Sequence, residues 1–356
     1  MPDELTLILA FATAAGLVQL TAPLAIRLAL RTGFLDHPVG YKKHGRPTPY
    51  LGGLGAMAAA LPVALVFGWD SDVLVIVACA AGLCAVGIVD DRAHLGAGVR
   101  VLAEFAAAFA LWRADLGWLL WNGNLMDLAL TTVWIVGLVN AFNLMDNLDG
   151  ATGTVGAVSA AGVGLVAGTQ GELAIAAMCF ALAGACASFL RFNLAQPARV
   201  FLGDGGSMPI GFLIAAGLTA VPSTPGFGTA AVFAVVPIVG LAALDTTLVV
   251  FSRVRRGVWI LTGGRDHLTH RLLDLVGTPQ KVALVLAGAQ ASLCALGFLL
   301  FDSTIVTVFT AATAYVILGA AAIAALEWPY VRAEARAAAE AALSPALASA
   351  RQESAS

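Results

Sequence analysis

Charged residues are scarce in this chain of 356 residues. Asp, Glu, Lys and Arg together make up 12% of it, hydrophobic residues make up 60%, and the mean hydropathy is +0.89. A soluble domain carries roughly 25% charged residues. The scarcity therefore excludes a soluble enzyme, a disordered chain and a fibrous repeat, and it indicates a polytopic membrane protein. The net charge of −3 gives no sign of a nucleic-acid partner, and we expect none.

The chain also has few cysteines and no pattern of a secretory leader. Its five cysteines are an odd number, lie inside apolar stretches and show no zinc-finger spacing, so we interpret them as small core residues. The first apolar run is longer than the core of a signal peptide, and Asp3 and Glu4 precede it where a leader would carry bases. We therefore expect this run to remain as a membrane-spanning helix.

Long hydrophobic runs recur along the chain. About 20 apolar residues in a helix span a hydrocarbon core of about 30 Å. Eleven segments predict an all-α membrane protein with eleven spans: 5–29, 51–69, 72–89, 100–115, 127–145, 150–168, 172–191, 206–222, 229–251, 281–301 and 304–326. Residues 1–326 form the predicted integral membrane domain, and 327–356 form a predicted cytoplasmic C-terminal tail.

The basic residues fall on one side of this predicted topology. With alternating spans and the N-terminus outside, one face holds the C-terminal tail and the loops 30–50, 90–99, 146–149, 192–205 and 252–280. These segments and the adjoining helix ends contain 18 of the 19 Lys and Arg residues, and Arg113 is the exception. Because Lys and Arg favour the cytoplasmic side, the pattern predicts a multi-pass plasma-membrane protein with its C-terminus in the cytoplasm.

Acidic residues gather on the same basic face. They lie at the predicted helix ends and are Asp90, Asp91, Asp146, Asp149 and Asp204. Asn140 and Asn143 precede Asp146 at a spacing of three residues, which places them along one side of a helix. Solvated loop acids are the alternative interpretation. Acids collected on a basic face favour a divalent cation instead, and oxygen ligands suit Mg²⁺, with Mn²⁺ as a second choice.

Histidines and glycines add a second signal on this face. Four of the five histidines lie in the two loops 36–53 and 265–271. The glycine-rich run 201–207 leads directly into a predicted helix, where small residues and free N–H groups suit a phosphate. A metal, basic groups and a phosphate site together predict phosphoryl transfer at the inner membrane surface.

In this combination the motifs resemble the polyprenyl-phosphate N-acetylhexosamine-1-phosphate transferase family. The pattern D-x-P-x-x-R-K-x-H-x-x-P-x-P-x-x-G-G is matched at Asp36, Pro38, Lys42, His44, Pro47, Pro49, Gly52 and Gly53. The paired aspartates of the family are matched at Asp90 and Asp91. The patterns N-x-x-N-x-x-D-G-x-D-G, F-M-G-D-x-G-S and H-x-H-H are matched at Asn140, Asn143, Asp146, Asp149 and Gly150, at Phe201, Gly203, Asp204, Gly206 and Ser207, and at His267 and His270. The chain departs from these patterns at Tyr41, Asn147, Leu202 and Thr269.

The resemblance implies a reaction and a set of partners. A HexNAc-1-phosphate passes from its UDP donor to a polyprenyl phosphate, UMP leaves, and the product serves synthesis of a cell-wall polymer or surface polysaccharide. The loop 265–272 and the pair Asp245-Thr246 resemble the branch that uses UDP-GlcNAc. The resemblance also implies pairing as a homodimer.

Residue roles follow from the same resemblance. Asp204 would hold Mg²⁺, with Asn143 as a second ligand. Asp90 and Asp91 would lie near the acceptor phosphate as catalytic groups, beside the catalytic His267 and His270. The predicted substrate-binding residues are Lys42, His44, Asn140, Asp146, Asp149, Arg265 and Arg271.

Three other functions stay open on the sequence alone. A phospho-MurNAc-pentapeptide transferase would share the reaction, although its usual run of three histidines followed by Phe-Glu is missing here. A transporter for a lipid-linked solute would suit the many glycines and Pro237, yet the polar residues gather at one face rather than midway across. An inactive scaffold would tolerate the departures at Tyr41 and Thr269.

Overall fold

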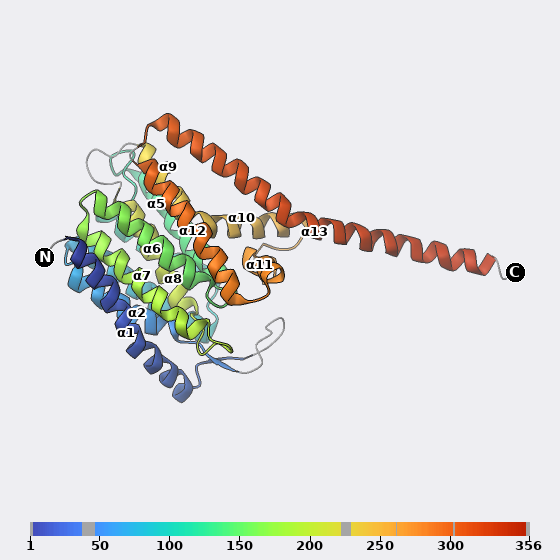
Figure 1. The fold of residues 1–356 in the computed structure, drawn as a ribbon, viewed down its shortest axis with the longest axis horizontal. Coiled ribbons are helices and arrows are strands. Elements are labelled where there is room, and N and C mark those ends of the chain that lie inside the picture. Colours follow the sequence, from blue (N-terminus) through green and yellow to red (C-terminus); the bar gives the residue numbers. More distant parts are fainter. Residues whose placement is uncertain (1–2, 38–46, 222–228, 261, 302, 354–356) are drawn as a thin grey trace.

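The computed structural model of the protein describes residues 3–37, 47–221, 229–260, 262–301 and 303–353. Figure 1 shows a bundle of helices from which the last helix projects at one end. The elements are α1 (Asp3–Thr32), β1 (Leu35–Asp36), β2 (Thr48–Pro49), α2 (Gly52–Phe67), α3 (Ser71–Ala93), α4 (Ala97–Arg113), α5 (Leu125–Met145), α6 (Ala151–Thr169), α7 (Leu173–Asn193), α8 (Asp204–Ala220), α9 (Thr229–Val235), the 3₁₀ turn η1 (Val236–Val239), α10 (Gly240–Arg255), α11 (Leu268–Val276), α12 (Pro279–Phe301) and α13 (Ile305–Glu353).

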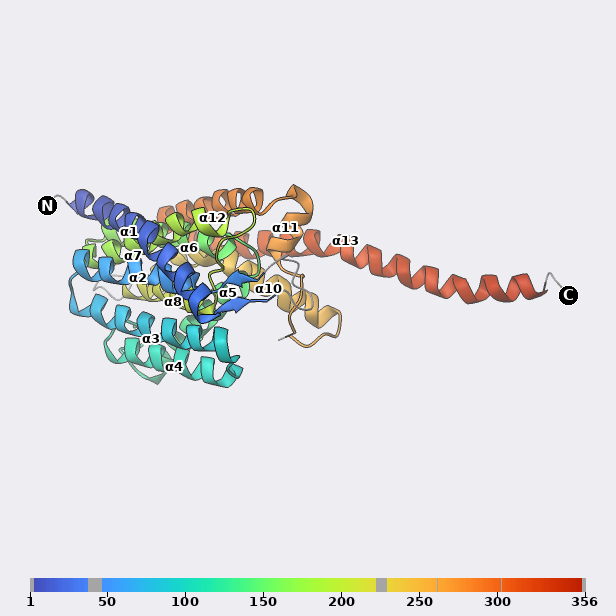
Figure 2. The same ribbon diagram turned by 90° about the horizontal axis from the view of Figure 1, so that it is seen from below.

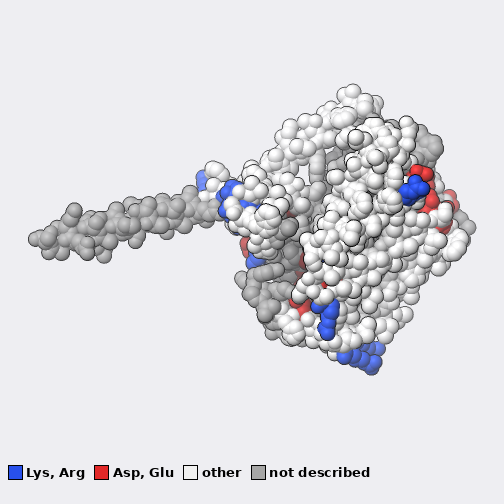
Figure 3. Space-filling view, turned by 180° about the vertical axis from the view of Figure 1, so that it is seen from behind, with Lys and Arg blue, Asp and Glu red and all other residues white. Residues whose placement is uncertain are grey.

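The all-α class of a multi-pass membrane protein is confirmed. Each of the eleven predicted segments is helical over most of its length. Within the described residues, eight helices are long and apolar enough to cross a membrane. The three remaining segments are shorter, because α2 has 16 residues and α4 and α8 have 17 each. Figure 3 shows a bundle wall with little charge, and its acids and bases collect toward the ends.

Small residues let the central helices approach one another closely. The helix α8 is buried along its whole length after Asp204, and its neighbours α3 and α5 also contact α4. Figure 2 shows α3 and α4 on one side of the bundle and α12 on the other. Gly184 of α7 lies against the backbone of Phe11 in α1, where a Cβ would approach the Phe11 carbonyl oxygen to 2.2 Å. Dispersion contacts between closely packed helices of this kind stabilise membrane bundles.

The predicted ninth span is interrupted in the structure. Pro237 lies in the turn η1, and the chain continues as α10 to Arg255 rather than ending at residue 251. Proline cannot donate a backbone hydrogen bond and disturbs the turn before it. The carbonyl oxygen of Ile238 accepts from Gln290 (2.7 Å) and Ser159 (2.8 Å), so side chains of neighbouring helices satisfy the interrupted backbone.

The last helix crosses the predicted domain boundary without a break. The boundary at residue 326 lies inside α13, which runs from Ile305 to Glu353. The predicted tail is therefore a continuation of the last helix up to residue 353, and it projects from the bundle in Figure 1. The division into a membrane domain and a cytoplasmic tail stays a prediction.

A short hairpin that the sequence analysis did not predict closes one end of the bundle. Leu35 pairs with Pro49 and Asp36 with Thr48. The chain then enters α2, where the N–H groups of Gly52 and Gly53 donate to the carbonyl oxygens of Phe201 (3.0 Å) and Leu202 (2.8 Å). The first loop is thereby fixed to the glycine-rich run before α8.

Gly53 provides a test of this contact. A Cβ there would lie 2.1 Å from the backbone nitrogen of Gly206, so Gly53→Ala must push α2 away from the start of α8. We expect a loss of about 1–3 kcal/mol of stability, the usual cost of overpacking, seen as a lower melting temperature in detergent. Gly82→Ala on α3 is the control, because nothing lies within 4 Å of the added Cβ. Equal melting temperatures of the two variants would contradict the contact.

Candidate active site

Carboxylates from α3 and from the end of α5 hold the turn that starts α8. Asp91 accepts from the backbone N–H groups of Asp204 (2.9 Å) and Gly205 (3.1 Å). Asp146, at the C-terminal end of α5, accepts from the N–H of Gly203 (3.2 Å). The first N–H groups of a helix lack partners within it and favour negative charge. Two acids that are far apart in the sequence therefore fix the glycine turn, and they bring Asp204 to the same place.

A second pair of acids shares one guanidinium. The Nη1 atom of Arg100, near the start of α4, lies 3.1 Å from Oδ2 of Asp90 and 3.3 Å from Oδ2 of Asp204. The other Asp204 oxygen accepts from the side-chain nitrogen of Asn143 (2.7 Å), which also donates to Ser207 (3.0 Å). The nitrogen of Asn143, rather than its oxygen, thus faces Asp204. The sequence analysis counted Arg100 only as a topology marker and missed this contact, because no motif included it.

Negative charge exceeds positive charge around this turn. Burial raises the pKa of Asp146 well above its usual value, and the charges of Asp204, Asp91 and Asp149 raise it further. Burial also raises the pKa of the Tyr50 hydroxyl, and Asp91, Asp146 and Asp204 add to the effect. Burial is the larger cause of both shifts, and the part caused by neighbouring carboxylates is what a bound cation would relieve.

The arrangement suits a cation that shares its ligands with a substrate. Among the residues that the structure describes, no group of three or more His, Cys, Asp or Glu side chains forms a complete metal cage. Mg²⁺ usually binds one or two carboxylates and completes its shell with water and substrate phosphates. Asp204, the predicted metal ligand at this helix start, fits that requirement as one such carboxylate.

Asn140 lies one step further from this cluster. Its side-chain nitrogen donates to the buried carboxylate of Glu104 on α4 (2.6 Å) and to the carbonyl oxygen of Val136 (2.9 Å). The bond to Glu104 joins α5 to α4, one helical turn after Arg100. The predicted contact of Asn140 with substrate stays a prediction.

The histidines of the later loop are held by α10. The Nδ1 atom of His267 lies 2.9 Å from Oδ2 of Asp245, and the other Asp245 oxygen accepts from the N–H of Leu268 (2.6 Å). His270 follows on α11, and its Nδ1 atom is buried without a hydrogen-bond partner. Burial, together with the nearby charges of Arg265 and His267, lowers the pKa of His270 to about 4. His270 is therefore uncharged near pH 7.

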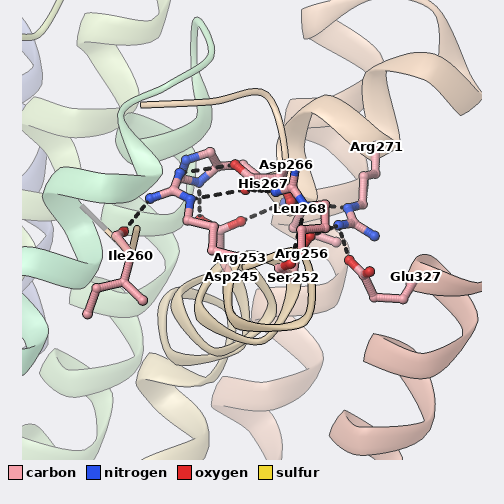
Figure 4. Close-up of polar contacts among 10 residues, drawn as sticks. All are labelled: Asp245, Ser252, Arg253, Arg256, Ile260, Asp266, His267, Leu268, Arg271 and Glu327. Atoms are coloured by element: carbon pink, nitrogen blue, oxygen red, sulfur yellow. Dashed lines mark hydrogen bonds and ion pairs between the residues drawn. The ribbon is translucent and has the colours of Figure 1, made fainter. Parts of the chain in front are cut away.

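Arg271, which follows His267 on α11, anchors the later loop. Arg271 is buried, pairs with Glu327 of α13, donates to the carbonyl oxygen of Leu326 (2.6 Å) and lies over the ring of Tyr330 (4.5 Å). Figure 4 shows this pair beside the contacts of α10 with the loop. Arg271 also donates to the carbonyl oxygen of Asp266 (3.1 Å) and to the hydroxyl of Ser252 (3.4 Å), whereas Arg265 is exposed. The predicted role of Arg271 in binding substrate stays a prediction.

Asp266 completes this anchor. It accepts from Nε and Nη2 of the buried Arg253 (3.0 Å each) and from Arg256 (2.5 Å). Burial tends to raise the pKa of Asp266, but the hydrogen bond and charge of Arg253 outweigh it and lower the pKa. The residue before His267 therefore stays ionised and fixed to α10, as Figure 4 shows.

Comparison with known proteins places this geometry in a family. Residues 73–221 match the model of glycosyl transferase family 4, a stretch that contains the acid cluster and the start of α8. A glycosyltransferase of Streptomyces coelicolor is 33% identical over 300 residues, which cover 80% of this chain and 67% of that protein. The chain belongs to glycosyl transferase family 4.

Two further relatives in glycosyl transferase family 4 carry more specific names. The decaprenyl-phosphate N-acetylglucosaminephosphotransferase of Mycolicibacterium smegmatis is 28% identical over 73% of this chain and 73% of its own length. The undecaprenyl-phosphate alpha-N-acetylglucosaminyl 1-phosphate transferase of Escherichia coli is 26% identical over 77% of this chain and 78% of its own length. The predicted family is confirmed.

Two departures from the family patterns contact each other. The hydroxyl of Thr269, where the pattern has His, donates to the side-chain oxygen of Asn147, where the pattern has Gly. The nitrogen of Asn147 donates to the carbonyl oxygen of Leu144 (2.7 Å). This contact fixes α11 to the loop that carries Asp146 and Asp149. Lys42, His44 and Tyr41 lie outside the described residues.

Two hollows of this family 4 protein open between elements that surround the candidate site. One, of about 210 Å³, lies between the loop before α8 and the start of α12, and Asp149, Gln196, Phe201 and Gln280 are among its lining residues. The other is an open apolar groove of about 610 Å³ between α4 and α5, with Val101, Leu102 and Phe105 on one side and Val133 and Val136 on the other.

His270 gives this site a measurable dependence on pH. Its folded pKa of about 4 lies below the ordinary 6.5, so the unfolded chain binds more protons between these values and stability falls as pH falls through that window. The melting temperature of the wild type should therefore fall between pH 7 and pH 5. In the variant His270→Gln this fall should be smaller. The exposed His37 is the control, and His37→Gln should follow the wild type. An equal fall in melting temperature for the wild type and His270→Gln would contradict the lowered pKa of His270.

Proposed function

We propose that the protein transfers HexNAc-1-phosphate, GlcNAc-1-phosphate above all, from a UDP-sugar to a polyprenyl phosphate, releasing UMP. The observation that carries the proposal is the meeting of Asp90, Asp91, Asp146 and Asp204 with Arg100 at one helix start. The names of the relatives from M. smegmatis and E. coli support the same acceptor class and sugar. The product is a polyprenyl-diphosphate sugar for a cell-wall polymer or surface polysaccharide.

The proposed topology places this chemistry at the cytoplasmic face of the plasma membrane. The acid cluster lies at the end of the bundle where the loops before α2, after α5 and before α8 contact one another. In the predicted topology all Lys and Arg residues except Arg113 belong to the same side, which the positive-inside rule assigns to the cytoplasm. With α2, α4 and α8 also spanning, the count is eleven and the N-terminus is outside. Pairing as a homodimer stays a prediction.

The acceptor would lie along the groove between α4 and α5. The groove is apolar and includes Gly98 and Val101, which flank Arg100 in the sequence of α4. A polyprenyl chain in the groove would leave its phosphate near Arg100, whose guanidinium pairs with Asp90 and Asp204. Asp91 is engaged by two backbone N–H groups, so Asp90 is the carboxylate better placed to accept a proton from the acceptor phosphate.

The donor would bind on the other side of the turn. The hollow beside Asp149 and Phe201 suits the nucleoside, because Asp146 and Gly203, which precede and follow these residues closely in the sequence, bond to each other in the acid cluster. Mg²⁺, held by Asp204 together with water and substrate oxygens, would neutralise charge on the diphosphate. An acceptor phosphate oxygen attacks the phosphorus that bears the sugar, the bond from that phosphorus to the UMP oxygen breaks, and His267 stabilises the charge that builds on UMP.

The direct test is UMP release by the purified protein in detergent micelles. With polyprenyl phosphate present, we expect release from UDP-GlcNAc, little from UDP-GalNAc or UDP-MurNAc-pentapeptide, loss with EDTA and recovery with Mg²⁺. Arg100→Ala should lower turnover by at least about tenfold, because it removes a cation from the reacting phosphates. Arg113→Ala at the opposite end of α4 is the control.

Two outcomes would contradict the proposal. Release only from the pentapeptide donor would make the protein a phospho-MurNAc-pentapeptide transferase. No UMP from any donor, with a folded protein, would favour the transporter, which needs two compartments and forms no product in micelles.

A further inference from the structure

One buried carboxylate takes part in neither the acid cluster nor the ion pairs that anchor the later loop. Asp245 lies in the middle of α10 and is 0% exposed. Its Oδ2 atom contacts Nδ1 of His267 at 2.9 Å, and its Oδ1 atom accepts the N–H of Leu268 at 2.6 Å. Figure 4 shows the side chain directed from the helix toward the loop. A buried carboxylate is costly unless such partners satisfy it.

The loop does not need this contact for its anchorage. Asp266, just before His267, is fixed by Arg253 and Arg256, and Arg271 is fixed by Glu327. Thr269 is fixed by Asn147. Since the loop is held on both sides of His267, the Asp245 contact has a more specific effect, which is to set the orientation and protonation of one imidazole ring.

A carboxylate can only accept, so the Nδ1 atom that faces it carries a proton. The Nε2 atom is then the ring nitrogen that remains for a ligand. Ionised Asp245 also stabilises the doubly protonated ring, in which Nε2 donates a charged hydrogen bond. Such a donor suits a phosphate that gains negative charge as it leaves.

We propose that Asp245 is a positioning residue that holds His267 with Nδ1 protonated, so that the ring carries positive charge toward the departing UMP. This inference rests on the proposed function. The bond between the sugar-bearing phosphorus and the UMP oxygen breaks, and the electron pair stays on UMP. The imidazolium of His267 lowers the energy of that charge, and Asp245 supplies the counter-charge that favours the imidazolium.

The variant Asp245→Asn separates this role from simple packing. The amide oxygen of Asn can still accept from Leu268, but its nitrogen presents a donor to the ring, which reverses the tautomer and removes the counter-charge. We expect kcat to fall by at least about tenfold, with KM for UDP-GlcNAc changed less than about threefold. Thr247→Ala is the control, because Thr247 is exposed on the same helix and its hydroxyl donates to the carbonyl oxygen of Ala243, one turn earlier in that helix.

A double variant tests whether the two residues act together. His267→Ala should lower kcat at least as much as Asp245→Asn, and adding Asp245→Asn to His267→Ala should lower it less than about twofold further. Additive losses, or kcat of Asp245→Asn within about twofold of the wild type, would overturn the proposal. If kcat fell in Asp245→Ala but stayed normal in Asp245→Asn, the role of Asp245 would be reduced to capping α11.

Nitrogen NMR of histidine-labelled protein in nanodiscs tests the pair without turnover. The His267 Nδ1 signal, assigned with His267→Ala, should be of the protonated type in the wild type and of the unprotonated type in Asp245→Asn. The same type in both proteins would overturn the proposal. Absence of UMP from every donor in the wild type would instead contradict the proposed function, and the nitrogen signals would still decide the state of the ring.

Discussion

The structure depends on one electrostatic constraint, the concentration of carboxylates around the N–H groups that begin α8. Asp91 and Asp146 use those N–H groups to hold the glycine turn, and Asp90 and Asp204 share the single guanidinium of Arg100. So many acids in a buried place are stable only with cations or donors beside them. This requirement explains why backbone N–H groups and Arg100 face these acids, and why the site suits a cation that would in turn bind phosphates.

The later loop is fixed to its neighbours by ion pairs and by one hydrogen bond. Its ion pairs fasten it to α10 through Asp266 and to α13 through Arg271, and its N-terminal turn contacts the acidic loop through Thr269 and Asn147. The two departures from the family patterns thus form one contact. The long last helix is part of the site's support, because Glu327 lies in it and pairs with both Arg255 and Arg271.

Patterns of hydrophobicity and motif predicted much of this arrangement. Apolar runs predicted the positions of the helices, since burial in lipid depends mainly on length and composition. The acids Asp91, Asp146 and Asp204 were predicted to meet, because each belongs to a motif. Arg100, Asp245 and Glu327 were not predicted as partners of the site, because their contacts depend on how helices pack. The same limit applies to the turn at Pro237. In that turn the carbonyl oxygen of Ile238 accepts from Gln290, which is 52 residues away in the sequence.

The most direct test of the central claim is Mn²⁺ binding measured by electron paramagnetic resonance, with Mn²⁺ standing in for Mg²⁺. The account predicts saturable binding that UDP strengthens, and its loss in Asp204→Asn. Asp274→Asn, an exposed acid on α11, should bind like the wild type. Unchanged Mn²⁺ binding in folded Asp204→Asn would contradict the claim that these acids form a cation site.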